Sequence, residues 1–325
     1  RARVISLLRQ GERVSGAVVR DLETGRELQV HARQVINATG VWTDDTQALA
    51  DTRGQFRVRA SKGVHLVIPR DRIQSSTGLI LRTENSVLFV IPWGRHWIVG
   101  TTDTDWDLDK NHPAVSARDV DYLLGQANRV LAQPLQVEDV ALVEVPAAWA
   151  HLQRRDLVVQ LVALAVPGLV VVAGGKYTTY RLMAKDAVDE AVRTLDENVP
   201  VSVTEQVPLL GAEGYPALWN QRGVLAERSG LHKARIEHLL QRYGTLIHEI
   251  LALLAQDAAS PEPLGLAEPL PGADDYLRVE VVYAVTAEGA RHLDDVLTRR
   301  TRASIESWDR GVRAAPVVAA LMAPL

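Results

Sequence analysis

The chain has 325 residues, of which 47% are hydrophobic and 23% are charged, and its formal net charge is −4. This length suffices for two domains and a large core, and the composition is that of an ordinary globular protein. The acidic balance disfavours nucleic-acid binding, and the absence of cysteine excludes disulfides, thiolate zinc sites and cysteine nucleophiles.

The first hundred residues are dominated by predicted strands. Apolar or alternating runs between glycine-containing turns predict strands at Val4–Leu8, Val14–Asp21, Glu27–His31 and Val35–Ala38, before a short helix over 43–50. Further strands are predicted at Phe56–Ala60, Gly63–Ile68, Gly78–Arg82, Ser86–Trp93 and His96–Gly100. This second run favours an antiparallel sheet with one face usable as a platform.

The rest of the chain is mostly helical in pattern. An amphipathic helix is predicted over 116–131 with Ser116 as its N-cap, and a buried strand at 169–174 precedes a helix from about Thr178 to Leu195. The composition changes near Val199, and helical patterns follow at 217–229, 233–242, 245–256, 276–287, 289–299 and 303–310. We therefore expect two domains, residues 1–197 and a helical domain of residues 198–325.

The strand-turn-helix around Gly174-Gly175-Lys176 has the features of a ligand site. Glycine lets the backbone approach a ligand without a Cβ clash, and the helix N-terminus offers free N–H groups and a positive dipole end. Lys176 adds a mobile cation. A tight strand-to-helix turn with a capping threonine explains the same residues, so both interpretations stay open on these residues alone.

Motifs in a fixed order make the resemblance to one family specific. The run Gly174–Arg181 is similar to the flavin-contacting signature of FAD-dependent glycerol-3-phosphate dehydrogenases. Three further matches precede it in the family's order: Val35–Trp42 beside the flavin, Lys62–Pro69 on the substrate side, and Ile91–Trp93 paired with Val99–Asp105. The helical segment with Tyr243-Gly244 and the run Thr298–Arg302 resemble the family's C-terminal domain.

The resemblance implies an α/β fold. It combines the remnant of an FAD-binding parallel sheet, an antiparallel substrate-side sheet at about 56–103 and a C-terminal helical domain. Residues 1–197 are then an FAD-dependent oxidoreductase domain. The expected cofactor is FAD, and the residues expected to contact it are Ala38, Thr39, Gly40, Thr101, Thr102, Asp103, Gly174, Gly175, Lys176, Thr178 and Thr179.

The activity that the resemblance implies is oxidation of sn-glycerol 3-phosphate to dihydroxyacetone phosphate. Hydride passes from C2 to flavin N5, and the electrons pass on to a quinone or, in oxidase variants, to oxygen. His65 is expected to accept the proton of the substrate hydroxyl, and Lys176 to help hold the charged substrate. We expect a cytoplasmic protein. Peripheral contact with the inner face of the cell membrane and homo-oligomerisation stay open.

Two other functions stay open. The chain could belong to another FAD-dependent oxidase of the same fold that acts on an amino acid, although Lys176 and the helical domain argue against this. It could also be a catalytically dead fragment that serves as an interaction module. The flavin content of the purified chain separates the second alternative from an enzyme.

The chain departs from the family pattern in two places. It has no Gly-x-Gly-x-x-Gly turn, which in this family cradles the FAD pyrophosphate. The family's aromatic-x-Gly-x-Arg-Pro-Leu stretch, whose arginine binds the substrate phosphate, is absent from residues 145–166, which we interpret as a sequence error or a true divergence. We therefore expect an N-terminally truncated enzyme that is inactive alone.

No metal site is expected. Aspartates at every second position over 103–109 invite a calcium-loop interpretation. Leu108, however, stands where an EF-hand needs glycine, and Ala114 stands where it needs the closing glutamate. We interpret these aspartates as a solvated acidic loop.

Overall fold

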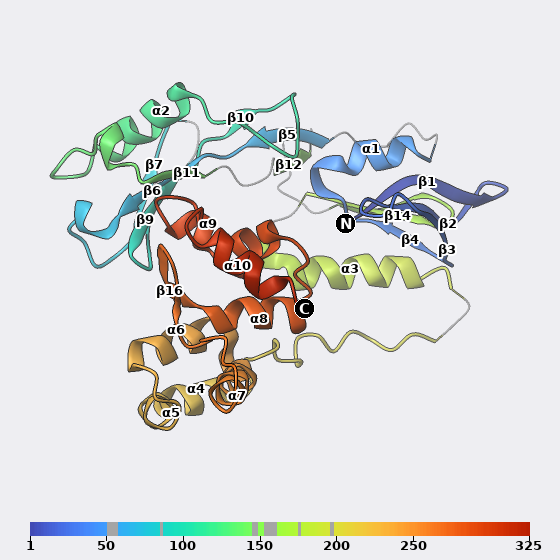
Figure 1. Cartoon of the computed structure of the whole chain (residues 1–325). Helices are drawn as coiled ribbons and strands as arrows, with labels where there is room; N and C mark the ends of the chain where they lie inside the picture. The colour runs from blue at the N-terminus through green and yellow to red at the C-terminus, as the bar shows by residue number, and fades with distance from the viewer. Residues whose placement is uncertain (51–57, 85–86, 145–148, 153–160, 175–176, 196–197) are drawn as a thin grey trace. The chain divides into compact units, whose positions relative to one another are not determined.

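A computed structural model describes residues 1–50, 58–84, 87–144, 149–152, 161–174, 177–195 and 198–325 (Figure 1). The chain divides into two compact units, Arg1–Glu205 and Gln206–Leu325, and each has its own hydrophobic core. This division lies shortly after residue 197, in the segment whose composition changes.

The first unit consists mainly of strands. Its strands are β1 (Ala2–Gln10), β2 (Arg13–Asp21), β3 (Glu27–His31), β4 (Val35–Asn37), β5 (Val58–Lys62), β6 (His65–Pro69), β7 (Leu79–Arg82), β8 (Val87–Trp93), β9 (His96–Gly100), β10 (Thr104–Asp105), β11 (Leu142–Glu144), β12 (Trp149–Leu152), β13 (Leu161–Val166) and β14 (Leu169–Ala173). Its helices are α1 (Thr43–Ala48), α2 (Ala117–Ala127) and α3 (Tyr180–Val192), with 3₁₀ turns η1 (Gly40–Trp42), η2 (Arg70–Arg72), η3 (Val137–Asp139) and η4 (Tyr177–Thr179). Strands β1, β2 and β3 form a separate antiparallel sheet.

Strands β4 and β14 pair in parallel, which agrees with the predicted remnant of a parallel sheet. Val35 pairs with Leu169 and Asn37 with Val171, while β13 lies antiparallel on the other side of β14. All residues of β14 are apolar and buried, as expected of a strand that is covered on both faces. The parallel pairing brings the carboxyl ends of β4 and β14 to one edge of this sheet.

A five-stranded antiparallel sheet, in the order β11-β6-β9-β8-β7, forms the second half of this unit. One of its faces is covered by α2, where Leu66, Val90 and Val99 pack with Leu123 in one buried cluster. Alternate residues of β8 and β9 are buried in this way, which leaves the opposite face for the residues between them. That opposite face carries His65.

The prediction of a single sheet over residues 56–103 is wrong in one respect. Strand β5 does not join the five-stranded sheet but pairs with β10 and β12 in a sheet of its own. Regular pairing stops at Gly63-Val64, between β5 and β6. A Cβ at Gly63 would lie 2.5 Å from Oγ1 of Thr101, so glycine leaves room for this side chain where the chain crosses from one sheet to the other.

The N-cap predicted for α2 is confirmed. Ser116 Oγ accepts the N–H of Asp119, and the Asp119 carboxylate accepts the N–H of Ser116 at 2.8 Å, which together form a capping box. The helix ends at Ala127 rather than at 131. The side chain of Asn128 holds the following turn, because it donates to Leu135 O at 2.9 Å and accepts the Leu135 N–H at 2.8 Å.

The second unit is helical around one core. Its elements are α4 (Tyr215–Asn220), α5 (Arg222–Ser229), α6 (Lys233–Tyr243), η5 (Gly244–Leu246), α7 (Ile247–Ala258), β15 (Pro269–Leu270), β16 (Ala273–Leu277), α8 (Arg278–Thr286), the π-helix η6 (Asp295–Arg300), α9 (Ala303–Glu306) and α10 (Ala315–Met322). Ile236, Leu239, Ile247 and Ile250 are fully buried in this core, which joins α6 to α7.

The helix predicted over 217–229 is two helices. Residue Gln221 separates α4 from α5, and the Arg222 guanidinium donates to Trp219 O at 2.9 Å while it pairs with Glu237. A basic side chain at the last carbonyls of α4 stabilises the break.

The predicted start of the helix over 289–299 is also wrong. Gly289 adopts a φ of +66°, and the Asp295 carboxylate accepts the N–H groups of Arg291 and His292, each at 3.1 Å. These bonds hold residues 291–292 outside the helix, so regular structure begins later. The sequence also missed the β15–β16 hairpin and α10.

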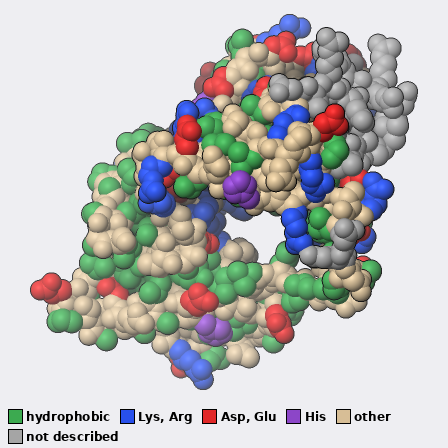
Figure 2. Space-filling model, turned by 90° about the vertical axis from the view of Figure 1, so that its right-hand side faces the viewer, with side chains coloured by type: hydrophobic (Ala, Val, Ile, Leu, Met, Phe, Trp, Pro, Cys, Tyr) green, Lys and Arg blue, Asp and Glu red, His purple; other side chains and the backbone are tan. Residues whose placement is uncertain are grey.

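None of the helices in the described part of the chain combines the length and apolar character that crossing a lipid bilayer requires. On the face drawn in Figure 2, Lys and Arg side chains are interspersed with Asp and Glu side chains.

Residues 206–325 expressed alone should fold. This unit encloses its own buried core, so its apolar side chains do not depend on the first unit for burial. We expect a cooperative thermal transition and a mostly helical circular dichroism spectrum. A random-coil spectrum would remove the domain boundary that we propose near residue 205.

Candidate functional site

The turn after β4 lies at the carboxyl end of the parallel pair. Asn37, which is 2% exposed, accepts the Thr39 N–H at 3.3 Å and the Thr39 hydroxyl at 2.6 Å, and its amide donates to Thr43 O at 3.2 Å. These bonds hold Ala38 and Thr39 in a tight turn. Gly40 follows with a φ of +60°, and a Cβ there would meet no atom of the described residues within 4 Å. The Gly40 backbone therefore borders open space at the edge where sheets of this kind bind ligands.

Strand β14 ends at the same edge. Gly174 follows it with a φ of +76°, in the left-handed region that favours glycine. The pairing of β4 with β14 therefore brings Gly174 to the edge that Gly40 borders. Gly175 and Lys176, the other residues predicted in this turn, lie outside the described residues.

The two threonines predicted as cofactor contacts lie just before α3. Thr178 and Thr179 are exposed and belong to the 3₁₀ turn η4. The helix predicted from about Thr178 begins at Tyr180 instead. Both threonines thus lie at the entrance of this helix.

His65 opens β6 and stands in a row of residues that crosses the five-stranded sheet. Backbone pairing places Glu144 on one side of His65 and Gly100 on the other, with Phe89 and Ile80 beyond Gly100. Directly opposed residues of antiparallel strands point to the same face. His65 therefore shares its face with Phe89 and Ile80, whose side chains are 38% and 71% exposed.

Gly100 provides the space for the His65 ring. A Cβ at Gly100 would lie 2.4 Å from Cδ2 of His65 and 2.9 Å from Val64 O. Burial of the imidazole lowers the pKa of His65 below its ordinary value, because the charged form loses its hydration. The neutral ring, which can accept a proton, is therefore favoured over a wider pH range.

The segment after β9 is held against the start of β6. Thr102 is 6% exposed, and its Oγ1 accepts the N–H of Val64 at 3.0 Å, while Thr101 Oγ1 donates to Thr102 O at 2.9 Å. Asp103 is exposed. The structure thus brings His65 together with the predicted cofactor residues Thr101 and Thr102, and it uses the Thr102 hydroxyl to hold the strand.

Strand β5 connects these two groups of residues. Val41 of η1 packs with Ala60 of β5 and with Trp106. From Ala60 the chain continues through Gly63 to His65. The edge at Gly40 and the row at His65 therefore belong to one framework within the first unit.

Sequence reasoning assigned no role to one buried residue near His65, Lys62. Lys62 stands in a recognised motif, but nothing in the pattern indicates that its Nζ donates to Asp119 Oδ2 at 2.7 Å and to Ala114 O at 2.8 Å. The partners are more than fifty residues away along the chain. The scarcity of lysine is the one signal that could have drawn interest to it.

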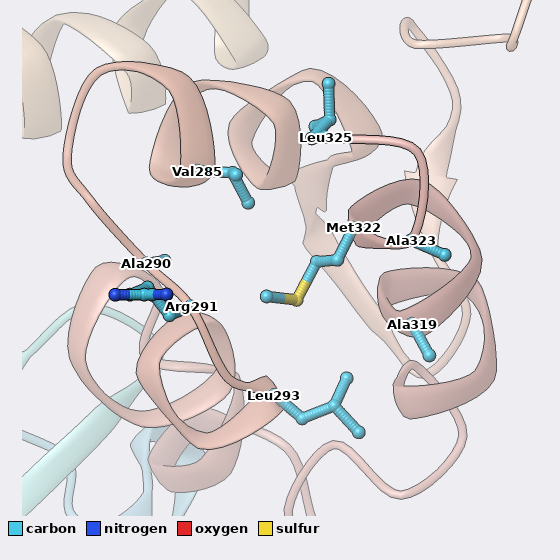
Figure 3. Close-up of a pocket in the computed structure, with 8 residues that line it drawn as sticks. All are labelled: Val285, Ala290, Arg291, Leu293, Ala319, Met322, Ala323 and Leu325. Carbon is cyan, nitrogen blue, oxygen red and sulfur yellow. The ribbon is translucent and has the colours of Figure 1, made fainter. Parts of the chain in front are cut away.

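Two further features lie in the second unit. An open cavity of about 440 Å³ is lined by Val285, Ala290, Arg291, Leu293, Ala319, Met322, Ala323 and Leu325 (Figure 3). Its lining is apolar apart from Arg291 and contains none of the predicted site residues.

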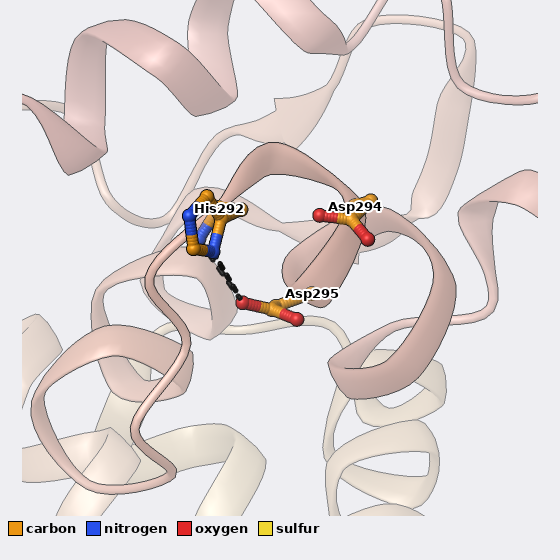
Figure 4. A group of neighbouring side chains, drawn as sticks. All are labelled: His292, Asp294 and Asp295. Carbon is orange, nitrogen blue, oxygen red and sulfur yellow. Dashed lines mark hydrogen bonds and ion pairs between the residues drawn. The ribbon is translucent and has the colours of Figure 1, made fainter. Parts of the chain in front are cut away.

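The second feature is an acidic cluster of His292, Asp294 and Asp295, whose ligand atoms lie within 4.8 Å of one another (Figure 4). Arg299 donates to Asp294 at 2.8 Å and to Asp295 at 3.0 Å. Burial raises the pKa of Asp295, but backbone hydrogen bonds from Arg291 and His292 outweigh it and hold this pKa at about 2. The cluster is thus accounted for as the start of the π-helix.

Two family models together match most of the chain. Residues 1–189 match the model described as FAD dependent oxidoreductase, and residues 202–325 match the C-terminal domain of alpha-glycerophosphate oxidase. The order of these two matches along the chain follows the two structural units.

Curated relatives are similar over nearly the whole chain. Glycerol-3-phosphate dehydrogenase 2 of Mycobacterium tuberculosis is 52% identical over 99% of this chain and 55% of its own length. The mitochondrial glycerol-3-phosphate dehydrogenase of Homo sapiens is 32% identical over 98% of this chain and 45% of its own length. The chain therefore spans about half the length of these relatives.

A solved structure shares the fold. Glycerol-3-phosphate dehydrogenase from Bacillus halodurans, solved in complex with FAD, has a TM-score of 0.84 and 25% sequence identity, and the match covers 99% of this chain and 64% of that one.

Proposed function

Because the chain belongs to the family of FAD-dependent oxidoreductases that includes the glycerol-3-phosphate dehydrogenases, we propose that it carries the substrate side of an enzyme that oxidises sn-glycerol 3-phosphate to dihydroxyacetone phosphate. The observation that carries this proposal is the identity with the Mycobacterium tuberculosis relative across nearly the whole chain. The arrangement around His65 supports it independently.

The residues at the parallel edge fit a flavin. The open backbone at Gly40 and the left-handed turn at Gly174 leave room for a planar ligand to approach the ends of β4 and β14. We assign Ala38, Thr39 and Gly40 to this cofactor, together with Thr101–Asp103, Gly174, Gly175, Lys176, Thr178 and Thr179. When bound, FAD supplies the acceptor for the hydride that leaves C2 of the substrate.

His65 is proposed to accept the proton from the substrate hydroxyl while the hydride leaves the same carbon. Its lowered pKa keeps the imidazole neutral, and its ring lies on the face of the sheet opposite α2. Lys176 is proposed to hold the substrate phosphate. A quinone as the electron acceptor, contact with the inner face of the membrane and homo-oligomerisation stay predictions.

The test uses the full-length enzyme, meaning this chain together with a segment that supplies the turn for the FAD pyrophosphate. Anaerobic addition of glycerol 3-phosphate should bleach the flavin absorption band, because the two electrons of the substrate reduce the flavin. The chain alone should lose added FAD on gel filtration, since it contains no glycine-rich pyrophosphate turn.

One outcome would contradict the proposed substrate, and another would contradict the expected loss of flavin from the chain alone. Bleaching by an amino acid but not by glycerol 3-phosphate would move the enzyme to the amino-acid oxidases of the same fold. Stoichiometric flavin retained by the chain alone would show that it completes its cofactor site in another way.

A further inference from the structure

A buried ion pair next to the His65 row has no part in the proposed reaction. Lys62 Nζ donates to Asp119 Oδ2 at 2.7 Å and to Ala114 O at 2.8 Å, and it lies 5.1 Å from the centroid of the Trp106 ring. The Lys62 and Asp119 side chains are 6% and 8% exposed. Separation of a buried ion pair is costly, because each charge would then stay buried without a counter-charge. Lys62 is therefore fixed relative to Asp119.

Asp119 is itself held in place by α2. Its Oδ2 accepts the Ser116 N–H at 2.8 Å and the Ser116 hydroxyl at 2.7 Å as part of the capping box. Burial raises the pKa of Asp119, but hydrogen bonds from Lys62 and Ser116 outweigh it and hold this pKa below its ordinary value. The carboxylate stays charged at neutral pH and ties the end of β5 to the first turn of α2.

Lys62 and the three residues that follow it each contact the end of β9 or the segment after it. The pairs are Lys62 with Thr104, Gly63 with Thr101, Val64 with Thr102 and His65 with Gly100. Two of these contacts are close, because a Cβ at Gly63 would lie 2.5 Å from Thr101 Oγ1 and a Cβ at Gly100 would lie 2.4 Å from His65 Cδ2. A shift of Lys62 would therefore move the imidazole and both threonines.

We propose that Lys62 is a positioning residue of this site. Through its ion pair with Asp119 it sets the placement of His65 and of Thr101–Asp103 against the flavin and the substrate. Neither Lys62 nor Asp119 is assigned to touch the reacting atoms. This inference rests on the proposed function, because it assigns Lys62 to the site of that reaction.

The test compares the full-length enzyme with bound FAD, its Lys62→Met variant and the double variant Lys62→Met/Asp119→Asn. Methionine keeps the length of the side chain without its charge. Asparagine keeps an oxygen that can accept from Ser116 and removes the carboxylate that the first substitution leaves buried and unpaired. We therefore expect the double variant to retain the fold even where the single variant loses it.

In the double variant we expect the thermal midpoint and flavin content of the wild type. We expect kcat to fall by about 10- to 100-fold, the loss that a displacement of about 1 Å of a reacting group produces. The KM for glycerol 3-phosphate should change less than kcat, and the flavin absorption maximum should shift because Thr101–Asp103 move against the ring.

Lys110→Met is the matched control. Lys110 Nζ pairs with Asp45 at 2.7 Å, but its side chain and that of Asp45 are 29% and 61% exposed. This variant should keep the kcat of the wild type, since exposed ion pairs contribute little.

The inference is overturned if the double variant shows the kcat, pH profile and flavin spectrum of the wild type. It is equally overturned if both variants lose fold and flavin together, because the ion pair is then an element of stability alone. A wild type that does not oxidise glycerol 3-phosphate would instead refute the proposed function. The flavin spectrum of the variants would still show whether Lys62 places Thr101–Asp103.

Discussion

Replacement of His65 by asparagine in the full-length enzyme should lower kcat for glycerol 3-phosphate by about 10²- to 10⁴-fold, the contribution of a positioned general acid or base. Asparagine nearly keeps the shape of the side chain but cannot take up the proton of the substrate hydroxyl. Flavin content should not change, because the residues at the parallel edge are untouched.

The pH dependence of kcat provides a second reading of the same variant. Burial lowers the pKa of His65 from its ordinary value of 6.5, so the neutral ring persists below that pH. The acidic limb of the wild-type profile should therefore lie below about pH 6.5 and should be absent from the variant. The same shift affects stability: the folded state binds this proton less readily than the unfolded state, so stability is lost as pH falls through the ordinary value.

His31→Asn is the control for this experiment. His31 ends β3 and is exposed, so its replacement should change neither kcat nor the pH profile. A His65→Asn enzyme with the turnover and acidic limb of the wild type would assign the proton to another group.

The family and the mixed α/β fold could be predicted from the sequence, and both are confirmed. Local patterns sufficed where one element decides its own structure. Ser116 caps α2 as predicted, and the apolar run of β14 forms the buried strand that its composition indicates. Motifs in a fixed order sufficed to identify the family, because each motif marks a separate part of one site.

The pairing of strands could not be predicted from local patterns. Residues 56–103 have the pattern of one antiparallel sheet, yet β5 pairs with β10 and β12, which lie far along the chain. Alternation of apolar residues specifies which face of a strand is buried, but it does not specify the neighbouring strand.

The contacts around His65 could not be predicted from the sequence either. The motif supplies a histidine on a strand, while its orientation depends on Gly100 and its support on Lys62 and Asp119. These contacts join segments more than thirty residues apart. Sequence alone gives them no signal beyond the residue types themselves.

Glu280→Ala should destabilise the second unit by about 3–5 kcal/mol, the cost of removing one partner from a buried charge pair. Glu280 is fully buried, and its carboxylate accepts the Tyr243 hydroxyl at 2.9 Å and the Leu277 N–H at 2.9 Å. Arg242 Nε and His238 Nε2 each lie 3.4 Å from the same carboxylate. Alanine therefore leaves a largely buried guanidinium without its counter-charge and α8 without its cap.

Hydrogen exchange of the amides in α6 and α8, measured in the whole chain, gives this loss as a drop in the free energy of opening. Glu280→Gln keeps an oxygen for Leu277 and Tyr243 and should cost about 1–3 kcal/mol, since the charge is lost but the hydrogen bonds remain.

The matched control for this network is Glu268→Ala. Glu268 pairs with Arg278 at 2.7 Å, but its side chain is 60% exposed, so its loss should cost no more than about 1 kcal/mol. Equal protection of α6 and α8 in Glu280→Ala and Glu268→Ala would show that the buried carboxylate contributes no more than a surface pair. A large difference would show that this buried carboxylate contributes to the contact between α6 and α8, because Tyr243 comes from α6 and Glu280 from α8.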